Sequence, residues 1–109
     1  MQTLIQVYLK SRTSLRDAIA GDTRHLSDYD FEVVREHQPG RNPGWLKLRS
    51  SRSDRRGAIN VEWHSGTGVL TCRVVNRGGT RPHRIIGDFL DYLLFRHRKR
   101  IQWVTMAPR

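Results

Sequence analysis

Cysteine is nearly missing from this chain, since Cys72 is the only one among 109 residues. A single thiol excludes a disulfide within the chain, and a reducing compartment such as the cytoplasm is the expected location. Long apolar runs are missing too, because no stretch approaches the ~20 residues that a membrane-spanning helix needs. The first residues lack a charged segment followed by an apolar stretch, so we expect no secretory signal.

Acidic residues are few, with 10 Asp and Glu against 20 Lys and Arg, which gives a net charge of +10. Residues 1–40 are close to neutral, whereas residues 41–109 carry 15 basic and 4 acidic side chains. A positive field of this size favours a polyanionic partner. The opposing interpretation is that 17 arginines against 3 lysines reflect a GC-rich coding sequence and that the charge serves solubility.

Motifs of catalysis and metal binding are lacking as well. The five histidines are dispersed, without the spacing of a metal site. Glu62 and His64 fall on one strand face, but a surface ion pair is the preferred interpretation, and Cys72 is expected in the core. Gly78 and Gly79 precede a helix without the Lys-Ser/Thr of a phosphate-binding loop. We therefore expect no catalytic residue, no cofactor and no metal.

The longest helical periodicity lies in residues 80–100. Apolar side chains recur there on one predicted helical face, namely at Ile86, Phe89, Leu90, Leu93 and Leu94. Thr80 is placed to cap this helix, Pro82 suits its first turn, and the basic run at its end suits the negative pole of the helix dipole. The pattern predicts a helix that covers a sheet.

A shorter helix is expected within residues 11–21. Ser14 and Asp17 match a capping box, and Gly21 is placed to end the helix. This helix follows an alternating strand at residues 4–9 and precedes turn-like residues at 22–28.

Four further strands are predicted between turn-like connectors, at residues 30–37, 45–50, 58–64 and 69–76. A hairpin closed by residues 65–68 places Trp63 opposite Leu70. The hairpin before it places Leu48 opposite Ile59. Both registers direct apolar side chains to the same face, which supports an antiparallel meander.

Residues 101–106 are predicted to form one more short strand. The resulting order is β-α-ββββ-α-β, a single α+β domain over residues 1–109. In it an antiparallel four-stranded meander packs against one long C-terminal helix, with an N-terminal strand plus short helix and a short C-terminal strand. The first and last strands are expected to be edge or inserted strands.

The sheet face turned away from the helix is the candidate binding surface. An indole beside cations on an open sheet suits base stacking and phosphate neutralisation of single-stranded nucleic acid. The candidate residues on this face are Trp45, Lys47, Arg49 and Arg73. Two alternatives stay open: Trp45 forms a dimer patch with Val69 and Val75, or the first helix or the 38–44 loop covers it.

Three basic clusters in loops and helix ends can deliver guanidinium groups to phosphates. They are a hairpin tip with Arg52, Arg55 and Arg56, the start of the long helix with Arg77, Arg81 and Arg84, and its end with Arg96, Arg98, Lys99 and Arg100. The predicted function is therefore non-enzymatic binding of nucleic acid, DNA or RNA, and not of a membrane. The alternative is a homodimeric protein-interaction or small-ligand module in which the charge is incidental.

Overall fold

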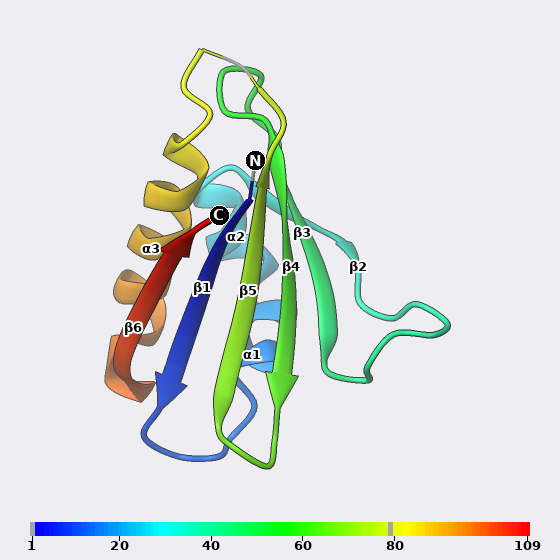
Figure 1. Ribbon diagram of the computed structural model, residues 1–109, viewed down its shortest axis with the longest axis vertical. Coiled ribbons are helices and arrows are strands. Elements are labelled where there is room, and N and C mark those ends of the chain that lie inside the picture. The colour runs from blue at the N-terminus through cyan, green and yellow to red at the C-terminus, as the bar shows by residue number, and fades with distance from the viewer. Residues whose placement is uncertain (1, 79) are drawn as a thin grey trace.

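The computed structural model describes residues 2–78 and 80–109, and an antiparallel sheet of six strands dominates that part of the chain (Figure 1). The elements in chain order are β1 (Gln2–Leu9), α1 (Leu15–Ala20), α2 (Thr23–Asp28), β2 (Phe31–Arg35), β3 (Trp45–Ser50), β4 (Gly57–His64), β5 (Val69–Asn76), α3 (Arg84–His97), the 3₁₀ turn η1 (Arg98–Arg100) and β6 (Ile101–Pro108). The predicted α+β class is confirmed. Gly79, expected in the turn before the long helix, lies outside the described residues.

The strand order is β2-β3-β4-β5-β1-β6. Both predicted hairpin registers are confirmed, because Trp63 lies opposite Leu70 and Leu48 lies opposite Ile59. The first strand is inserted between β5 and β6, and β6 forms an edge of the sheet. The C-terminal end of the chain thus returns to the side of its N-terminal strand.

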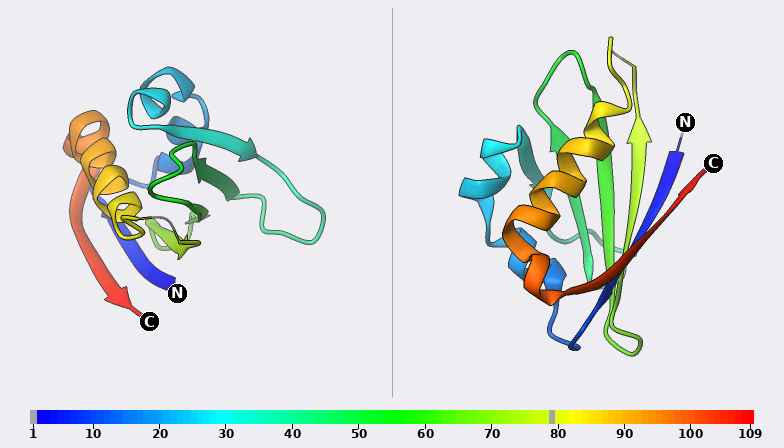
Figure 2. Two further views of the ribbon diagram at one scale, coloured as in Figure 1. Left: turned by 90° about the horizontal axis from the view of Figure 1, so that it is seen from above. Right: turned by 90° about the vertical axis from the view of Figure 1, so that its left-hand side faces the viewer.

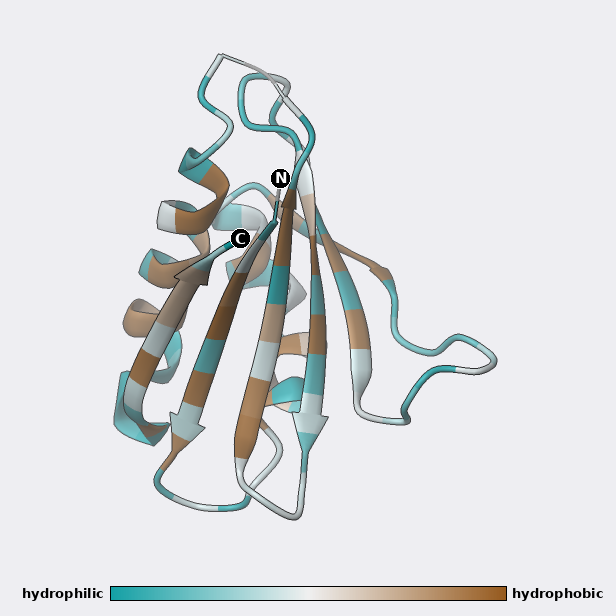
Figure 3. Ribbon diagram, viewed as in Figure 1, coloured by the Kyte–Doolittle hydropathy of each residue, from teal (hydrophilic) through white to brown (hydrophobic). Residues whose placement is uncertain are grey.

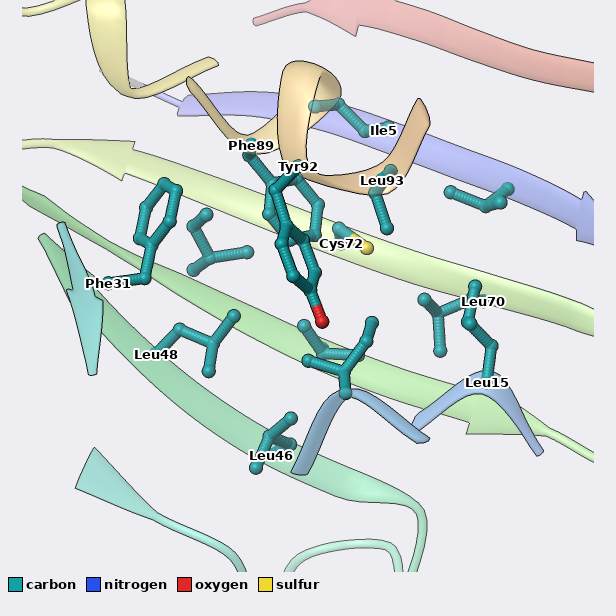
Figure 4. Close-up of a cluster of buried hydrophobic side chains, with 14 of the residues drawn as sticks. Ile5, Leu15, Phe31, Leu46, Leu48, Leu70, Cys72, Phe89, Tyr92 and Leu93 are labelled. Carbon is teal, nitrogen blue, oxygen red and sulfur yellow. The ribbon is translucent and has the colours of Figure 1, made fainter. Parts of the chain in front are cut away.

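The three α-helices lie on one face of the sheet, which curves around them (Figure 2). The inward side chains of the strands and the buried sides of the helices form one core (Figure 4). Cys72 is fully buried within it, as expected, and burial raises the pKa of its thiol. We call the opposite face of the sheet the outer face. None of the helices in the described part of the chain covers it, so it carries the solvent-exposed side chains of the central strands (Figure 2).

The long helix differs from its prediction in extent and in orientation. It begins at Arg84, and His83 rather than Thr80 precedes its first turn. Its fully buried side chains are Ile85, Phe89, Tyr92 and Leu93. The face expected to be buried is therefore rotated, and Leu94 is 44% exposed. The reason is Tyr92, whose hydroxyl donates a 2.8 Å hydrogen bond to Asp22 and holds this side of the helix inward.

The residues expected to form a turn at 22–28 contain the second helix, α2. Leu26 is its one buried side chain, so the segment carries too little apolar periodicity to predict a helix. The predicted cap at Ser14 and the helix end at Gly21 are confirmed, because the Ser14 hydroxyl accepts a hydrogen bond from the Asp17 amide and Gly21 follows the last residue of α1.

Arg16 joins α1 to the sheet. Its side chain is 7% exposed, and its Nε and Nη2 donate to the carbonyl of Trp45 at 3.2 and 3.0 Å. Nη2 also donates to the carbonyl of Glu36, and Nη1 donates to Asp17 at 2.9 Å. A guanidinium suits this position because its fork reaches two backbone carbonyls at once.

We expect Arg16→Met to lower the free energy of unfolding by about 2–4 kcal/mol, because the buried carbonyl of Trp45 and the partly buried carbonyl of Glu36 lose a charged donor. Arg16→Lys keeps the charge but not the fork, so its free energy of unfolding should lie between those of wild type and Arg16→Met. Asp17→Asn removes only the ion pair with Arg16, and it should change the free energy little because the Asp17 side chain is 72% exposed. Urea unfolding measures all four proteins, and a free energy for Arg16→Met equal to that of wild type contradicts the anchoring role.

Candidate nucleic-acid interface

Trp45 does not offer a stacking surface, and its predicted exposure is wrong. The side chain is 1% exposed, although it lies outside the main core. The guanidinium of Arg41 lies 5.4 Å from the centroid of its ring. Asn42 holds the loop in this position, because its side chain accepts a hydrogen bond from Gly44 and its carbonyl accepts one from Trp45. The structure thus matches the alternative in which the 38–44 loop covers Trp45.

Two predicted phosphate ligands at one end of the molecule are already paired with carboxylates. Arg52 donates to Asp54 at 3.1 Å and lies 3.8 Å from Asp30. Arg55 holds Asp88 of α3 through two bonds from Nη1, at 3.1 and 2.9 Å, and its side chain is 12% exposed. The hydrogen bond from Arg52 lowers the pKa of Asp54. This hairpin tip is therefore braced against α3 and is not a free finger.

Two further predicted ligands are paired elsewhere. Arg49 donates to Glu32 on the neighbouring strand β2. Arg96 donates to Asp22 at 3.0 and 3.2 Å. A phosphate would therefore compete with a carboxylate for either guanidinium.

The other predicted ligands have no carboxylate partner within residues 2–78 and 80–109; they are Lys47, Arg56, Arg73, Arg98, Lys99 and Arg100. Lys47 and Arg56 border a shallow hollow together with Arg77. Arg73 projects from β5 on the outer face, in a polar depression with Asn60 and Thr71.

The basic clusters occupy opposite ends of the molecule. The amide of Arg77 donates to the carbonyl of Arg56 at 2.9 Å, and the amide of Arg81 donates to Asp54, so the first two clusters share one end (Figure 1). The third follows α3, whose 14 residues span about 21 Å. One continuous positive surface is therefore not formed.

Tyr8 and Trp103 form an exposed aromatic pair that the sequence did not reveal. Their rings lie 5.0 Å apart between centroids, at 32° to each other, on the adjacent strands β1 and β6. Trp103 is 50% exposed, and Tyr8 is half-buried. The alternation of residues 4–9 in the sequence already places Tyr8 on the face opposite to Ile5, Val7 and Leu9. Its pairing with Trp103 depends on a strand order that sequence reasoning did not provide.

The aromatic pair lies beside unpaired cations. The amide of Lys10 donates to the carbonyl of Arg100 at 2.9 Å, which joins the end of β1 to the turn η1. Lys10 follows Tyr8 by two residues, and Arg100 precedes Trp103 by three. Three extended residues span about 10 Å, so both cations lie within about 10 Å of the aromatic pair along the chain. We call η1, with Arg98, Lys99 and Arg100, the basic turn; its three side chains are exposed.

Asp22 is the centre of a polar network between α2 and α3. It accepts hydrogen bonds from Tyr92 at 2.8 Å, His25 at 2.8 Å and Arg96, and His97 lies 3.8 Å away. Burial alone raises the pKa of Asp22, but the hydrogen bonds from Arg96, Tyr92 and His25 lower it to about 2. Burial lowers the pKa of His97 to about 4, against the attraction of Asp22. These contacts join α2 to α3, so we assign the network a structural role.

Other chemistry on the described residues is sparse. Glu62 and His64 lie 4.0 Å apart with side chains 36% and 41% exposed, as a surface pair does. No group of three potential metal ligands occurs in residues 2–78 and 80–109. In the same part of the chain, no helix has the length and apolar character needed to cross a membrane. Comparison with models of known families, with curated proteins and with solved structures finds no match.

The folded protein should lose stability between pH 6.5 and 4. His97 has a folded-state pKa of about 4 against an ordinary 6.5, so the stability it contributes is complete above pH 6.5 and lost as the pH falls to 4. The loss due to this residue is up to about 3 kcal/mol. Asp22 adds a second loss as the pH falls from 3.8 towards 2.

Urea unfolding at pH 7, 5.5 and 4.5 measures this dependence. His97→Asn should flatten it, whereas His37→Asn, at an exposed histidine, should leave it unchanged. A wild-type curve no steeper than that of His97→Asn over this window contradicts the assignment.

Proposed function

We propose that the protein binds single-stranded nucleic acid without catalysis, on the outer face around Tyr8 and Trp103. The observation that carries this proposal is the exposed aromatic pair bordered by the unpaired basic turn. Aromatic rings on neighbouring strands provide flat surfaces for bases, and guanidinium groups beside them neutralise phosphates. Trp103 takes the stacking role that the sequence suggested for Trp45.

The electrostatic part of the proposal uses few cations. Lys10 and the basic turn lie at one end of the aromatic pair. Arg73 lies further along the outer face, opposite Leu4 of β1. Between them, the outer positions of β1, β5 and β6 carry uncharged polar side chains, such as Gln6 and Thr71, that can bond to base edges. A strand that follows this path meets cations at both ends and an aromatic surface near one end.

A single strand fits this surface better than a duplex. Stacking on a protein ring requires a base that has left its own stack, and single strands supply such bases at low energetic cost. The cations next to the aromatic pair, Lys10 and the basic turn, lie together at one end of it and do not form the two parallel rows that both backbones of a duplex would need. In this proposal the protein works in the cytoplasm, where its one thiol stays reduced.

Trp103→Ala should weaken binding to a 12-nucleotide oligo(dT) or oligo(U) by 10- to 100-fold, since one stacked base contributes about 1–3 kcal/mol. Trp103→Phe should retain most of the affinity. Fluorescence anisotropy at low salt measures the dissociation constants. Phe95→Ala is the matched control, because this aromatic side chain is 68% exposed on α3, away from the outer face. Absence of wild-type binding at low salt, or an equal loss in the control, would sink the proposal.

The salt dependence tests the basic turn. Exchanging both Arg98 and Arg100 for Gln should lower the slope of log affinity against log salt by about 1.4, at ~0.7 for each phosphate contact on a single strand. Exchanging Arg52 and Arg55 for Gln removes the same charge at the opposite end and should leave the slope unchanged. Equal slopes for the two double variants would mean that net charge alone attracts the oligonucleotide.

A further inference from the structure

The two edges of the sheet are protected to different degrees. An exposed edge strand offers unpaired backbone groups to another strand, and proteins oppose this with short strands, charges and bulges. The strand β2 has all three features: it has five residues, it includes Glu32 and Arg35, and its register shifts after Val33. The other edge, β6, has eight residues, and none of them is charged.

The free backbone groups of β6 can be assigned from its pairing with β1. The amide of Arg109 donates to the carbonyl of Gln2, and bonding positions alternate along an antiparallel ladder. Residues 103, 105 and 107 therefore point towards β1, whereas the amides and carbonyls of Val104 and Met106 point away from the sheet. The backbone of Pro108 also points away from β1. Proline has no amide hydrogen, so no hydrogen bond to β1 is lost at this position.

Apolar side chains gather along the same edge. Met106 is 53% exposed and Trp103 50%, and Leu94 of α3 is 44% exposed. Leu94 and Met106 line a groove of about 470 Å³ between α3 and β6 together with Leu90 and Val104, and Arg98 borders it, whereas the ring of Trp103 packs on Tyr8 at the outer face of the same strand. Figure 3 shows apolar segments of β6 reaching the free edge. The opposite edge carries a single exposed large apolar side chain among the described residues, that of Val34.

We propose that β6 pairs in antiparallel fashion with β6 of a second copy of this chain, in a symmetric homodimer with one continuous sheet. The register places Val104 opposite Met106 of the second copy, Thr105 opposite its own counterpart, and Trp103 opposite Ala107. In this register the amides and carbonyls of Val104 and Met106 that point away from β1 meet the carbonyls and amides of the same residues in the second copy, because even-numbered residues lie opposite even-numbered residues. Trp103 meets the smallest side chain of the strand, so the large ring has room.

The uncharged strand explains why the occupant is a second copy. The twofold axis places Thr105 opposite its own counterpart and its neighbours opposite residues only two to four positions away, so a charge near the centre would lie close to its own copy, and a chain of net charge +10 has few stretches without one. The strand pair alone is smaller than the ~800 Å² per partner that a stable interface buries. The groove supplies the remainder, since Val104 and Met106 of each copy extend towards Leu94 of the other.

The dimer extends the sheet without covering its outer face. The twofold axis is perpendicular to the sheet, so both outer faces point the same way, and two aromatic pairs lie on one surface. Dimerisation does not depend on nucleic-acid binding and is measured without any oligonucleotide. One proposal can therefore fail while the other holds.

Light scattering coupled to size exclusion at 10–200 μM measures the mass, which we expect to be twice the chain mass of 12.8 kDa. Met106→Pro removes an amide that points away from β1 and makes no hydrogen bond to it, so this variant should remain folded but become a monomer. Met106→Lys should also yield a monomer, because it places an unpaired charge in the groove. Hydrogen exchange should show the Val104 and Met106 amides protected in wild type and at least 10-fold less protected in the Met106→Lys monomer.

Val34→Lys is the matched control, since it makes the same kind of change at the opposite edge and should leave the dimer intact. Circular dichroism establishes that each variant is folded, and Met106→Lys decides the question if Met106→Pro does not fold. A monomeric wild type over the whole concentration range overturns the proposal. So does a dimer that persists in Met106→Lys, or one that Val34→Lys dissociates.

Discussion

The carboxylate of Asp22 determines how the long helix lies on the sheet. It accepts hydrogen bonds from Tyr92 and Arg96 of α3 while it precedes the first turn of α2. With Tyr92 held inward, the apolar side of α3 is rotated and Leu94 remains exposed beside β6. A largely covered carboxylate is stable here because charged and hydroxyl donors replace most of its lost water. The apolar groove at the sheet edge is thus a consequence of a polar contact on the other side of the same helix.

Contacts that are close in sequence were predicted well, and contacts that are distant in sequence were not. The two hairpin registers follow from alternation and loop length, which lie within about 20 residues of the chain. The helix α2 offers one buried residue, Leu26, and the orientation of α3 depends on Asp22, some 70 residues earlier. Trp45 has the alternation of an outward residue and is nevertheless buried, because the loop before it folds back and places Arg41 over its ring. Periodicity describes a strand or a helix but not what covers it.

The distribution of charge along the chain also differs from its distribution in space. Three of the six acidic residues in the first 40 positions pair with arginines of the later part: Asp22 with Arg96, Asp30 with Arg52 and Glu32 with Arg49. Folding therefore uses part of the positive charge that the second half carries. Of the predicted phosphate ligands without a carboxylate partner, Arg98, Lys99 and Arg100 lie together at the C-terminal end of α3, whereas Lys47, Arg56 and Arg73 lie on β3, the hairpin tip and β5. Net charge favours polyanions in general, but the location of the unpaired groups narrows the candidate surface to the region around the basic turn.

The insertion of β1 between β5 and β6 underlies both proposals. It brings Tyr8 next to Trp103, two aromatic residues separated by most of the chain, and it leaves β6 as an uncharged edge strand. Had β6 paired elsewhere, the aromatic pair would not exist and the edge would belong to another strand. The two features nevertheless use different groups of β6, since stacking requires the outward ring of Trp103 and dimerisation requires the free backbone of Val104 and Met106. A single strand can serve both because the side chains of a sheet project perpendicular to its hydrogen bonds.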